Sequence, residues 1–375
     1  MNSFHHKIVT SVSDIERSQW ELLFGRIPES YGFYQTLETS HLEGFSFYYL
    51  LLYQDRDLIL IAPLFTGDFD LGLAVEGIMK KIIQGIRKLF PRFMILKTLF
   101  CGSPFGENGV IGLSRNQSNR DSVMEELAKA MIIYCSLNQI PFIMFKDFLD
   151  AEMPLMKPLL QQNFFEVESF PSVRVELGPG GMEGYFQTLS RHARKDLRKK
   201  IKKVLSLGSI EVKVVDDVET IINDIYPLYL NTYNAGAVRF EKLTKEFFVN
   251  VGRYMSGQTK FFLYYVQGHL AAFNLCFQDQ YILIDKFIGF DYELTRKYHL
   301  YFFSWYTNIE WCLKHSLRFY QVGQTDYKEK LRLGGYPLPL HVFVRHHNPM
   351  INRVLKSISK LLTPSQNNDD LKLHE

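Results

Sequence analysis

An acidic side chain, Asp285, stands inside an otherwise apolar run of the sequence, QYILIDKFIGF. Alternation along a strand predicts that Asp285 shares one face with Leu283 and Phe287 and that Lys286 lies on the opposite face. Burial disfavours the charged form of a carboxylate, which suits such a group to act as a general base. A salt bridge to a lysine or an arginine is an equally simple role, and both interpretations stay open.

A second group of polar residues lies where another strand is expected to end, in QVGQTDYKEKLRLGGYPLP. A helix that begins near Asp326 would place Tyr327, Lys328 and Lys330 at the carboxyl end of that strand, where open α/β sheets bind ligands. Asp326 would then be in a position to cap the helix. Tyr327 is a candidate site residue, and packing is its simpler alternative role.

The third feature is a strongly basic amphipathic segment, residues 185–208. Its apolar residues recur every three or four positions, at Phe186, Leu189, Ala193, Leu197, Ile201 and Val204. This spacing predicts one helix with an apolar stripe, and Gly208 is a suitable stop. The other positions carry eight cations: Arg191, Arg194, Lys195, Arg198, Lys199, Lys200, Lys202 and Lys203. A solvated helix face is the ordinary explanation of such a charge run.

Eight cations offset only by Asp196 repel one another, and an anionic partner would relieve this repulsion. The phosphates of a nucleotide cofactor, RNA and lipid headgroups are the candidates. Arg191, Arg194, Lys195 and Arg198 are the side chains expected to contact that partner.

Other catalytic and metal-binding patterns are absent from the sequence. It contains no GxSxG, P-loop, HExxH or strand-linked GxGxxG motif. The four cysteines are far apart and lack ligand spacing, so we expect buried thiols, no metal and a reducing, cytoplasmic compartment. The formal net charge of +3 is too small to mark a general nucleic-acid binder. No signal-peptide core and no apolar stretch of the ~20 residues needed to span a bilayer is present.

The elements that position these residues form a pattern that occurs twice. Hairpins are predicted at residues 45–65 and 259–277, where short polar turns separate aromatic and β-branched runs. Each is followed by an amphipathic helix, at 121–139 and 299–315, and then by a further strand. A last strand, VRVEL or LHVFV, is expected to close each unit.

Duplicated units with a mixed α/β sheet (α+β in character) are the simplest explanation, and the length of 375 residues suits two domains. The expected divisions are 1–177 for the N-terminal unit, 184–348 for the C-terminal unit and 349–375 for a basic helix with a polar tail. GPGGMEG supplies the glycine-rich break between the units.

The ordered motifs LSRHARKDLRKKIKK, LYLNTYN, GHLAAFNLCF, IGFD and YQVGQTDYKEKLRLGGYPLP resemble the GNAT-like acyltransferase domain of CelD-type proteins. They are also similar to the FemAB aminoacyltransferases, which carry two GNAT-like units in one chain. The resemblance covers residues 171–345. The first half resembles the other unit, here taken as degenerate, through its helix around Trp20, its hairpin and the LFCGSPFGENG loop.

The resemblance implies transfer of an acyl group from a thioester or ester donor to an amine. In such folds a carboxylate on the central strand assists deprotonation of the amine, and a later tyrosine protonates the departing thiolate. The matching positions are Asp285 and Tyr327. The family's glycine-containing phosphate loop is replaced by residues 295–300, which contain no glycine. The remaining candidates for contact with an acyl-CoA donor, a substrate rather than a bound cofactor, are Arg296, Lys297, His299, Lys328 and Lys330.

Three functions are consistent with this sequence. The first is an N-acyltransferase that moves an acyl group from an acyl-CoA-type donor to an amine on a sugar, an amino acid or a lipid-linked cell-envelope precursor. The second is a Fem-type transferase that uses aminoacyl-tRNA, although residues 210–258 are too short for the long helical hairpin of several such enzymes. The third is a non-catalytic protein that binds membrane surfaces or RNA.

Two further basic, amphipathic segments bear on the third function, residues 77–97 and 350–362. Helices of this kind can lie among lipid headgroups, and packing on their own domain is the alternative. The expected location is therefore the cytoplasm, with peripheral contact at the inner membrane face left open.

Overall fold

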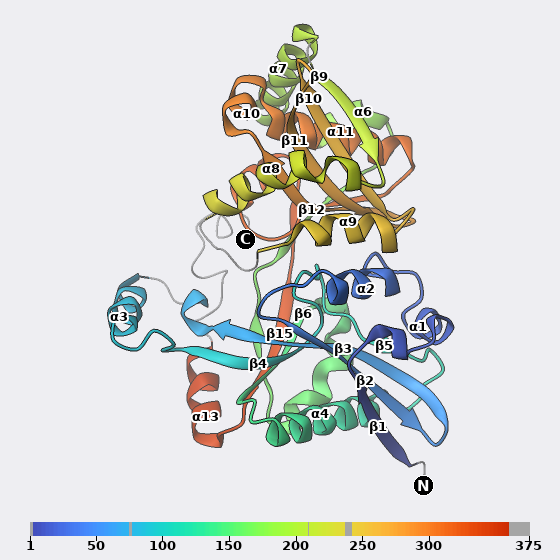
Figure 1. The fold of residues 1–375 in the computed structure, drawn as a ribbon, viewed down its shortest axis with the longest axis vertical. Coiled ribbons are helices and arrows are strands. Elements are labelled where there is room, and N and C mark those ends of the chain that lie inside the picture. Colours follow the sequence, from blue (N-terminus) through green and yellow to red (C-terminus); the bar gives the residue numbers. More distant parts are fainter. Residues whose placement is uncertain (1–2, 75–76, 209, 237–241, 360–375) are drawn as a thin grey trace. The chain divides into compact units, whose positions relative to one another are not determined.

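The computed structural model describes residues 3–74, 77–208, 210–236 and 242–359. The chain forms two compact units (Figure 1). Unit 1 contains the chain up to Gly25, Gly44–Pro171 and the chain from Pro339 on. Unit 2 contains Arg26–Glu43 and Ser172–Leu338. The chain therefore passes between the units more than once.

Unit 1 is built on a mixed sheet with the strand order β1-β2-β3-β4-β6-β15-β7, and β5 pairs with β3. Its strands are β1 (Phe4–Val9), β2 (Ser46–Gln54), β3 (Asp57–Asp70), β4 (Ile95–Cys101), β5 (Gly112–Leu113), β6 (Phe142–Leu149), β7 (Phe165–Glu168) and β15 (Leu340–His346). Its helices are α1 (Arg17–Phe24), α3 (Gly77–Arg87), α4 (Arg120–Leu137), α5 (Met153–Met156) and α13 (Pro349–Ile358). Helix α4 packs on this sheet through a core that includes Leu127, Met131 and Phe145.

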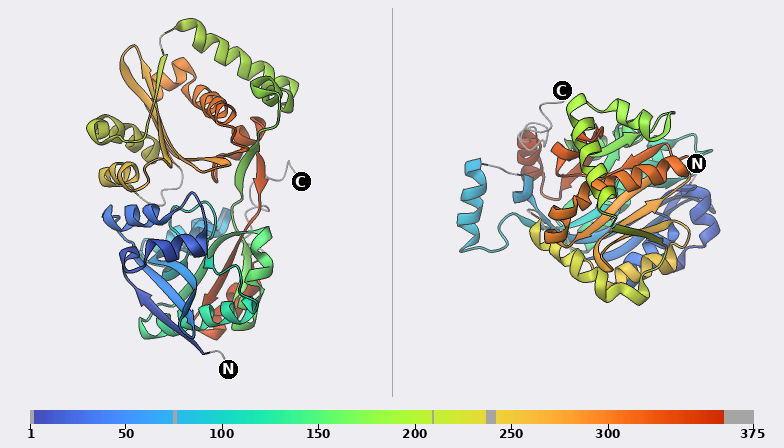
Figure 2. Two further views of the ribbon diagram at one scale, coloured as in Figure 1. Left: turned by 90° about the vertical axis from the view of Figure 1, so that its right-hand side faces the viewer. Right: turned by 90° about the horizontal axis from the view of Figure 1, so that it is seen from above.

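Unit 2 has a second mixed sheet with the order β14-β8-β13-β12-β11-β10-β9. Its strands are β8 (Ser172–Glu176), β9 (Ile210–Val215), β10 (Thr259–Val266), β11 (His269–Gln278), β12 (Ile282–Phe290), β13 (Phe319–Gln321) and β14 (Tyr336–Leu338). Its helices are α2 (Tyr31–Thr39), α6 (Gly181–Thr188), α7 (Arg191–Leu207), α8 (Ile222–Ala235), α9 (Lys245–Tyr254), α10 (Tyr292–Tyr298), α11 (Leu300–Lys314) and α12 (Tyr327–Arg332). Figure 2 shows α8 and α9 on one face of this sheet and α7 and α11 on the other.

The two sheets confirm the predicted duplication but correct its closing strands. In each sheet one pair of neighbours is parallel, β4 with β6 and β12 with β13, and the helix between them in sequence is the predicted one. The last strands are exchanged: β8 pairs with β13 and β14 in unit 2, and β15 pairs with β6 and β7 in unit 1. The expected divisions at residues 177 and 348 therefore differ from the observed units. Alternation identifies a strand, but it does not choose between two similar sheets.

Helix α2 is a third segment that lies in a different unit from the expected one. It belongs to unit 2, where it lies against α9. A Cβ atom at Gly32 would lie 2.1 Å from the carbonyl oxygen of Tyr254, so this close approach requires glycine. Thr36 and Asn250 add hydrogen bonds: Thr36 Oγ1 donates to the Asn250 carbonyl at 3.3 Å, and Asn250 Nδ2 donates to Thr39 Oγ1 at 3.1 Å.

The basic segment is also divided differently from the prediction. Residues 185–208 form the end of α6 and the whole of α7, with a break at Leu189–Ser190. Ser190 is the N-cap of α7, and its hydroxyl accepts a hydrogen bond from the Ala193 amide at 3.2 Å. Gly208 ends α7 in the left-handed conformation (φ 57°), as predicted.

Gly289 of β12 packs closely against α8, and its replacement tests the packing of this helix on the sheet. A Cβ atom at Gly289 would lie 2.7 Å from backbone atoms of Leu228 and Tyr229 on α8. We expect Gly289→Ala to lower the free energy of unfolding by about 1–3 kcal/mol, because backbone atoms cannot move aside cheaply. Urea unfolding measures this change. Gly178→Ala is the control, since no atom lies within 4 Å of the added methyl group; equal losses in both variants would contradict the packing argument.

Candidate active site

The parallel strands β12 and β13 are paired only along the first part of β12. Their pairing runs from Ile282–Phe319 to Ile284–Gln321 and ends there. Asp285 is therefore the first residue of β12 beyond the last pair. It lies at a split between two parallel strands, at the carboxyl end of β13, where α/β sheets leave room for a ligand.

A β-bulge follows directly and changes the faces of β12. Cys276 pairs with Asp285 and Leu275 with Phe287, which leaves Lys286 as the extra residue. The Phe287 ring packs against Tyr229 of α8 and Phe247 of α9. The hydrogen-bond partners of Asp285, in contrast, connect it to α11 on the opposite face. The predicted shared face of Asp285 and Phe287 is therefore wrong, because strict alternation does not hold across a bulge.

Asp285 is held by a buried network of neutral groups. Asn274 Nδ2 donates to its Oδ1 at 2.5 Å, and the Tyr320 hydroxyl donates to its Oδ2 at 2.9 Å. Asn308 of α11 completes the ring, since its Nδ2 donates to Asn274 Oδ1 at 2.5 Å and to the Tyr320 hydroxyl at 2.9 Å. Asn274 and Asn308 are fully buried. The position and orientation of the carboxylate are thereby determined on two sides.

The groups around Asp285 remain protonated near neutral pH. Burial, and then the Asp285 charge, raise the pKa of Tyr320 well above its usual value. Burial also raises the pKa of Tyr264 and of the Cys276 thiol, with Asp285 again adding to the shift. Tyr320 can therefore keep donating its proton to the carboxylate as a neutral phenol.

The neighbouring Lys286 points away from this network. Its Nζ lies 3.6 Å from Glu29 Oε1, and both side chains are almost fully buried, at 2% and 7% exposed. The same Nζ lies 5.7 Å from the centre of the Phe277 ring. Glu29, in the segment before α2, therefore provides the counter-charge of Lys286, which neighbours Asp285 on β12. No local sequence pattern predicted this pair.

Tyr327 is the first residue of α12 and only 1% exposed. The loop before it is strained, because both Thr325 (φ 67°) and Asp326 (φ 49°) adopt the left-handed conformation without being glycine. Asp326 occupies the N-cap position but makes no side-chain capping hydrogen bond, so the predicted cap is wrong. Lys330 Nζ donates to the Gln324 carbonyl at 2.9 Å and holds the loop from the other end.

Helix α7 is attached to both elements that flank the split. Arg332 of α12 donates through Nη1 to Asp196 Oδ2 at 2.9 Å, and Lys200 binds the same oxygen at 2.7 Å. Lys200 Nζ also lies 3.6 Å above the Phe302 ring, in the first turn of α11. Asp196, the single acid of the basic run, thus joins α7 to α12.

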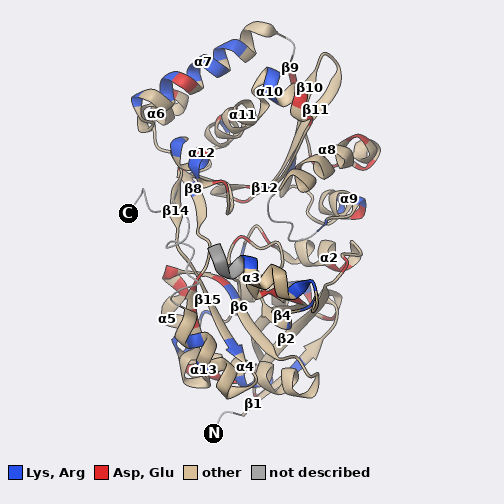
Figure 3. Ribbon diagram, turned by 90° about the vertical axis from the view of Figure 1, so that its left-hand side faces the viewer, with Lys and Arg blue, Asp and Glu red and all other residues tan. Residues whose placement is uncertain are grey.

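The basic residues of α7, blue in Figure 3, are only partly neutralised within the protein. Arg198 forms a bidentate pair with Glu183 of α6 at 2.6 Å, so one of the four predicted anion contacts has an internal partner. Within the part of the chain that the structure describes, no ion pair is formed by Arg191, Arg194 or Lys195. Arg191 and Lys195 are exposed to solvent, and Arg194 is half-buried.

The start of α11 brings the second set of predicted cations close to α7. His299 separates α10 from α11 in the left-handed conformation (φ 51°). Burial lowers its pKa, and the charges of Lys203 and Lys200 lower it further, so it is neutral at pH 7. Arg296 and Lys297 lie exposed in the preceding turn, and Lys328 is exposed on α12. Two basic features that are far apart in the sequence are thereby neighbours in unit 2.

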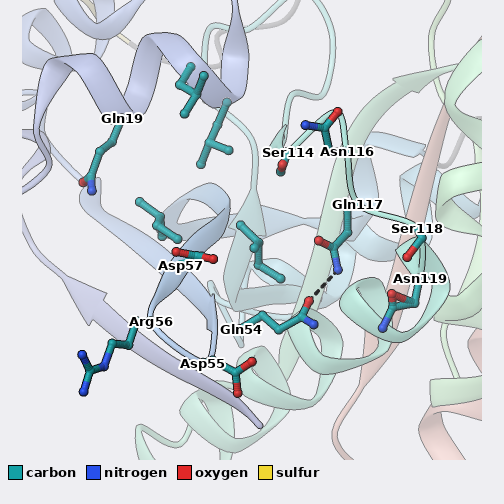
Figure 4. A pocket seen from close by; sticks show the side chains of 14 residues that line it. Gln19, Gln54, Asp55, Arg56, Asp57, Ser114, Asn116, Gln117, Ser118 and Asn119 are labelled. Carbon is teal, nitrogen blue, oxygen red and sulfur yellow. Dashed lines mark hydrogen bonds between the residues drawn. The ribbon is translucent and has the colours of Figure 1, made fainter. Parts of the chain in front are cut away.

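Each unit has a hollow beside these elements. In unit 1, a polar hollow of about 640 Å³ lies beside the β2–β3 turn, and Figure 4 shows Gln117 donating to Gln54 there at 2.8 Å. In unit 2, a hollow of about 630 Å³ lies between α7, α11 and the β9–β10 edge. Its lining is mainly apolar and includes Val212, Val214, Phe262, Phe303, Tyr306 and Trp311.

The described residues contain no group of three histidines, cysteines or acidic residues that could hold a metal ion. All four cysteines are buried, and burial raises the pKa of the Cys135 thiol to about 12. No helix among the described residues is long and apolar enough to cross a membrane.

Comparison with known proteins identifies the fold. Residues 191–331 match the family described as acetyltransferase (GNAT) domain. A tandem GNAT protein from the clavulanic acid biosynthesis pathway is similar in structure, with a TM-score of 0.53 at 10% identity over 92% of this chain and 99% of that one. FemX is similar with a TM-score of 0.59 at 11% identity over 94% of this chain and 100% of that one. The chain therefore has the tandem GNAT fold.

The GNAT match includes every predicted site residue, from Arg191 to Lys330. The second repeat thus contains the segment that matches the acetyltransferase (GNAT) domain. A curated relative from Mycobacterium tuberculosis, a putative 8-amino-7-oxononanoate synthase 2, is 26% identical over 327 residues, or 84% of this chain. The chain spans less than half of that relative's length, 42%.

Proposed function

We propose that this protein is an N-acyltransferase that moves an acyl group from an acyl-CoA-type thioester to a primary amine. The observation that carries the proposal is the position of Asp285 at the first residue beyond the β12–β13 pairing, inside the GNAT-matching segment. A carboxylate at that split can accept a proton from an amine that attacks a thioester lying between the strands.

The proposed step is a simple displacement. The neutral amine attacks the thioester carbonyl, the C–N bond forms and the C–S bond breaks. Asp285 accepts the amine proton, while Asn274 and Tyr320 hold the carboxylate in place. Tyr327 donates a proton to the thiolate that leaves. These roles place base and acid on different elements, β12 and α12, on the two sides of the split.

The donor's phosphates are expected near the start of α11. Arg296, Lys297 and Lys328 are exposed there, His299 begins the helix, and the amino-terminal end of a 15-residue helix attracts anions. Lys330 is a weaker candidate, because its ammonium group holds the Gln324 carbonyl. An anionic group further along the ligand would contact Arg191, Arg194 and Lys195. Arg198 is not part of this set, because it pairs with Glu183.

Besides the sugar, amino-acid and lipid-linked acceptors expected from the sequence, we propose an amine on an aliphatic chain as the acceptor. The hollow between α7 and α11 is lined mainly by apolar and aromatic side chains, which suit a hydrocarbon chain. The name of the curated relative describes a compound with an amino group on such a chain. Sugar and amino-acid acceptors then form the comparison set in an activity screen.

A donor screen tests the proposal. Thermal shift and product formation are measured with acetyl-CoA, long-chain acyl-CoA and aminoacyl-tRNA, each with aliphatic amines, amino sugars and amino acids. We expect acyl-CoA to stabilise the protein and N-acyl product to form with an aliphatic amine. If only aminoacyl-tRNA stabilises the protein and gives product, the reaction is of the Fem type. If no donor does so, the proposal that the protein is an acyltransferase is wrong.

Replacement of Tyr327 by phenylalanine tests the proposed acid. We expect Tyr327→Phe to lower turnover by about 10²-fold with little change in donor affinity, because only protonation of the leaving group is lost. Steady-state kinetics and donor titration measure the two quantities. Tyr281→Phe, at an exposed tyrosine of unit 2, is the control. If turnover of Tyr327→Phe is unchanged, Tyr327 is a packing residue.

A further inference from the structure

Two segments of unit 1 expose four large apolar side chains each. The first is the segment from α3 to the turn that follows it, where Leu89 is 79% and Phe90 66% exposed. Ile82 and Phe93 are also exposed in this segment. The second is α13, which exposes Met350, Ile351, Val354 and Ile358. Apolar side chains exposed in groups, rather than singly, mark a surface that another apolar phase covers.

Internal contacts hold the first segment in its place. Arg87 donates to Asp70 Oδ2 at 2.7 Å and to the Phe93 carbonyl at 3.0 Å, which closes the turn onto the end of β3. Arg92 pairs with Asp68 at 2.9 Å, and Ile83 is buried. The exposed side chains between Arg87 and Arg92 are therefore presented by a supported turn.

Helix α13 is supported in the same way. Asn348 caps it by accepting from the Met350 amide at 2.9 Å, and Asn352 Nδ2 donates to the Asn163 carbonyl at 2.9 Å. Leu355 packs against the apolar core of unit 1. The apolar residues Met350 and Val354 are on the exposed side of the helix.

Both exposed surfaces are basic. Residues 81–93 contain Lys81, Arg87, Lys88 and Arg92 and no acidic residue, and α13 contains Arg353 and Lys356 and no acidic residue. Asp70 and Asp68 neutralise two of these cations. The two elements lie on the same flank of unit 1 (Figures 1 and 3). We call α3, its following turn and α13 the basic-apolar flank.

We propose that the basic-apolar flank binds the surface of an anionic lipid bilayer. Leu89 and Phe90 enter the boundary between headgroups and acyl chains, while Lys88, Arg353 and Lys356 remain among anionic headgroups. Charge complementarity selects this occupant: a nucleic acid would leave the apolar side chains in water, and an apolar protein face would leave the cations without counter-charges. The proposal is independent of the acyl-transfer reaction.

Vesicle flotation of the full chain tests this proposal. Phosphatidylcholine vesicles with and without 30% phosphatidylglycerol (about one charge in three lipids) are compared at low and high salt. We expect flotation with the anionic vesicles at low salt. Leu89→Ser combined with Phe90→Ser should lower the partition coefficient at least about tenfold, because two large side chains no longer transfer from water. Lys88→Glu combined with Lys356→Glu should weaken binding only to the anionic vesicles.

Leu22→Ser is the matched control, since Leu22 of α1 is 75% exposed but lies outside the flank. We expect it to float like the unmodified chain, and all variants should retain the same melting temperature. Recovery of the unmodified chain only in the soluble fraction, or an equal loss in Leu22→Ser, would overturn the proposal. Light scattering that shows a dimer abolished by Leu89→Ser would overturn it in favour of self-association.

Discussion

Replacing Asp285 with asparagine is expected to lower turnover by about 10²–10⁴-fold, the usual contribution of a positioned general base. The amide has nearly the shape of the carboxylate, so the split between β12 and β13 should persist. It cannot accept a proton from the attacking amine. Steady-state kinetics with an acyl-CoA donor and an aliphatic amine measure the loss, and the melting temperature confirms that unit 2 remains folded.

The pH dependence of this loss distinguishes a base from a residue that only supports the fold. Below the pKa of the acceptor amine, the neutral fraction of a free amine rises about tenfold for each pH unit. The unmodified enzyme can also use the ammonium form of the acceptor, because Asp285 takes up its extra proton, whereas the variant depends on the neutral form alone. The difference in turnover between the two should therefore narrow as pH rises. Asp216→Asn, at an exposed acid paired with Lys260, should leave turnover unchanged. A gap that is the same at every pH would exclude the base role.

Breaking the buried pair between Lys286 and Glu29 should cost about 3–5 kcal/mol of unfolding free energy, the largest stability effect that we expect. In Glu29→Gln the lysine ammonium stays buried without its counter-charge, and in Lys286→Met the carboxylate does. The double variant Glu29→Leu with Lys286→Met should recover much of this loss, because apolar side chains can fill the same space.

Urea unfolding is followed by tryptophan fluorescence, to which Trp305 and Trp311 of unit 2 contribute together with Trp20 of unit 1. The exposed pair of Arg318 and Glu176 is the control, and Arg318→Gln should change the free energy of unfolding by no more than about 1 kcal/mol. If the single variants Glu29→Gln and Lys286→Met are as stable as the unmodified protein, the prediction is wrong and water reaches both charges.

Much of the candidate site was predictable because its signals are local. The hairpins, the strand around Asp285 and the helix after it follow from periodicity and turn residues, and all are present. The order of motifs was sufficient to predict a tandem GNAT fold. The sequence did not predict the network that holds Asp285. Asn274, a polar residue inside the apolar run GHLAAFNLCF, was the one local sign of it. Asn308 gave no signal, because one asparagine in a helix has many ordinary roles.

The sequence by itself determined the elements, their double occurrence and the chemical character of Asp285, Tyr327 and the basic helix, since these depend on residues close together in the chain. Only the tertiary structure decided which sheet receives β8 and β15 and that α2 serves unit 2. It also decided that a bulge at Lys286 separates the face of Asp285 from that of Phe287. These outcomes depend on pairings between distant segments, where several partners satisfy the same local pattern and only packing and hydrogen bonding in the folded chain select one.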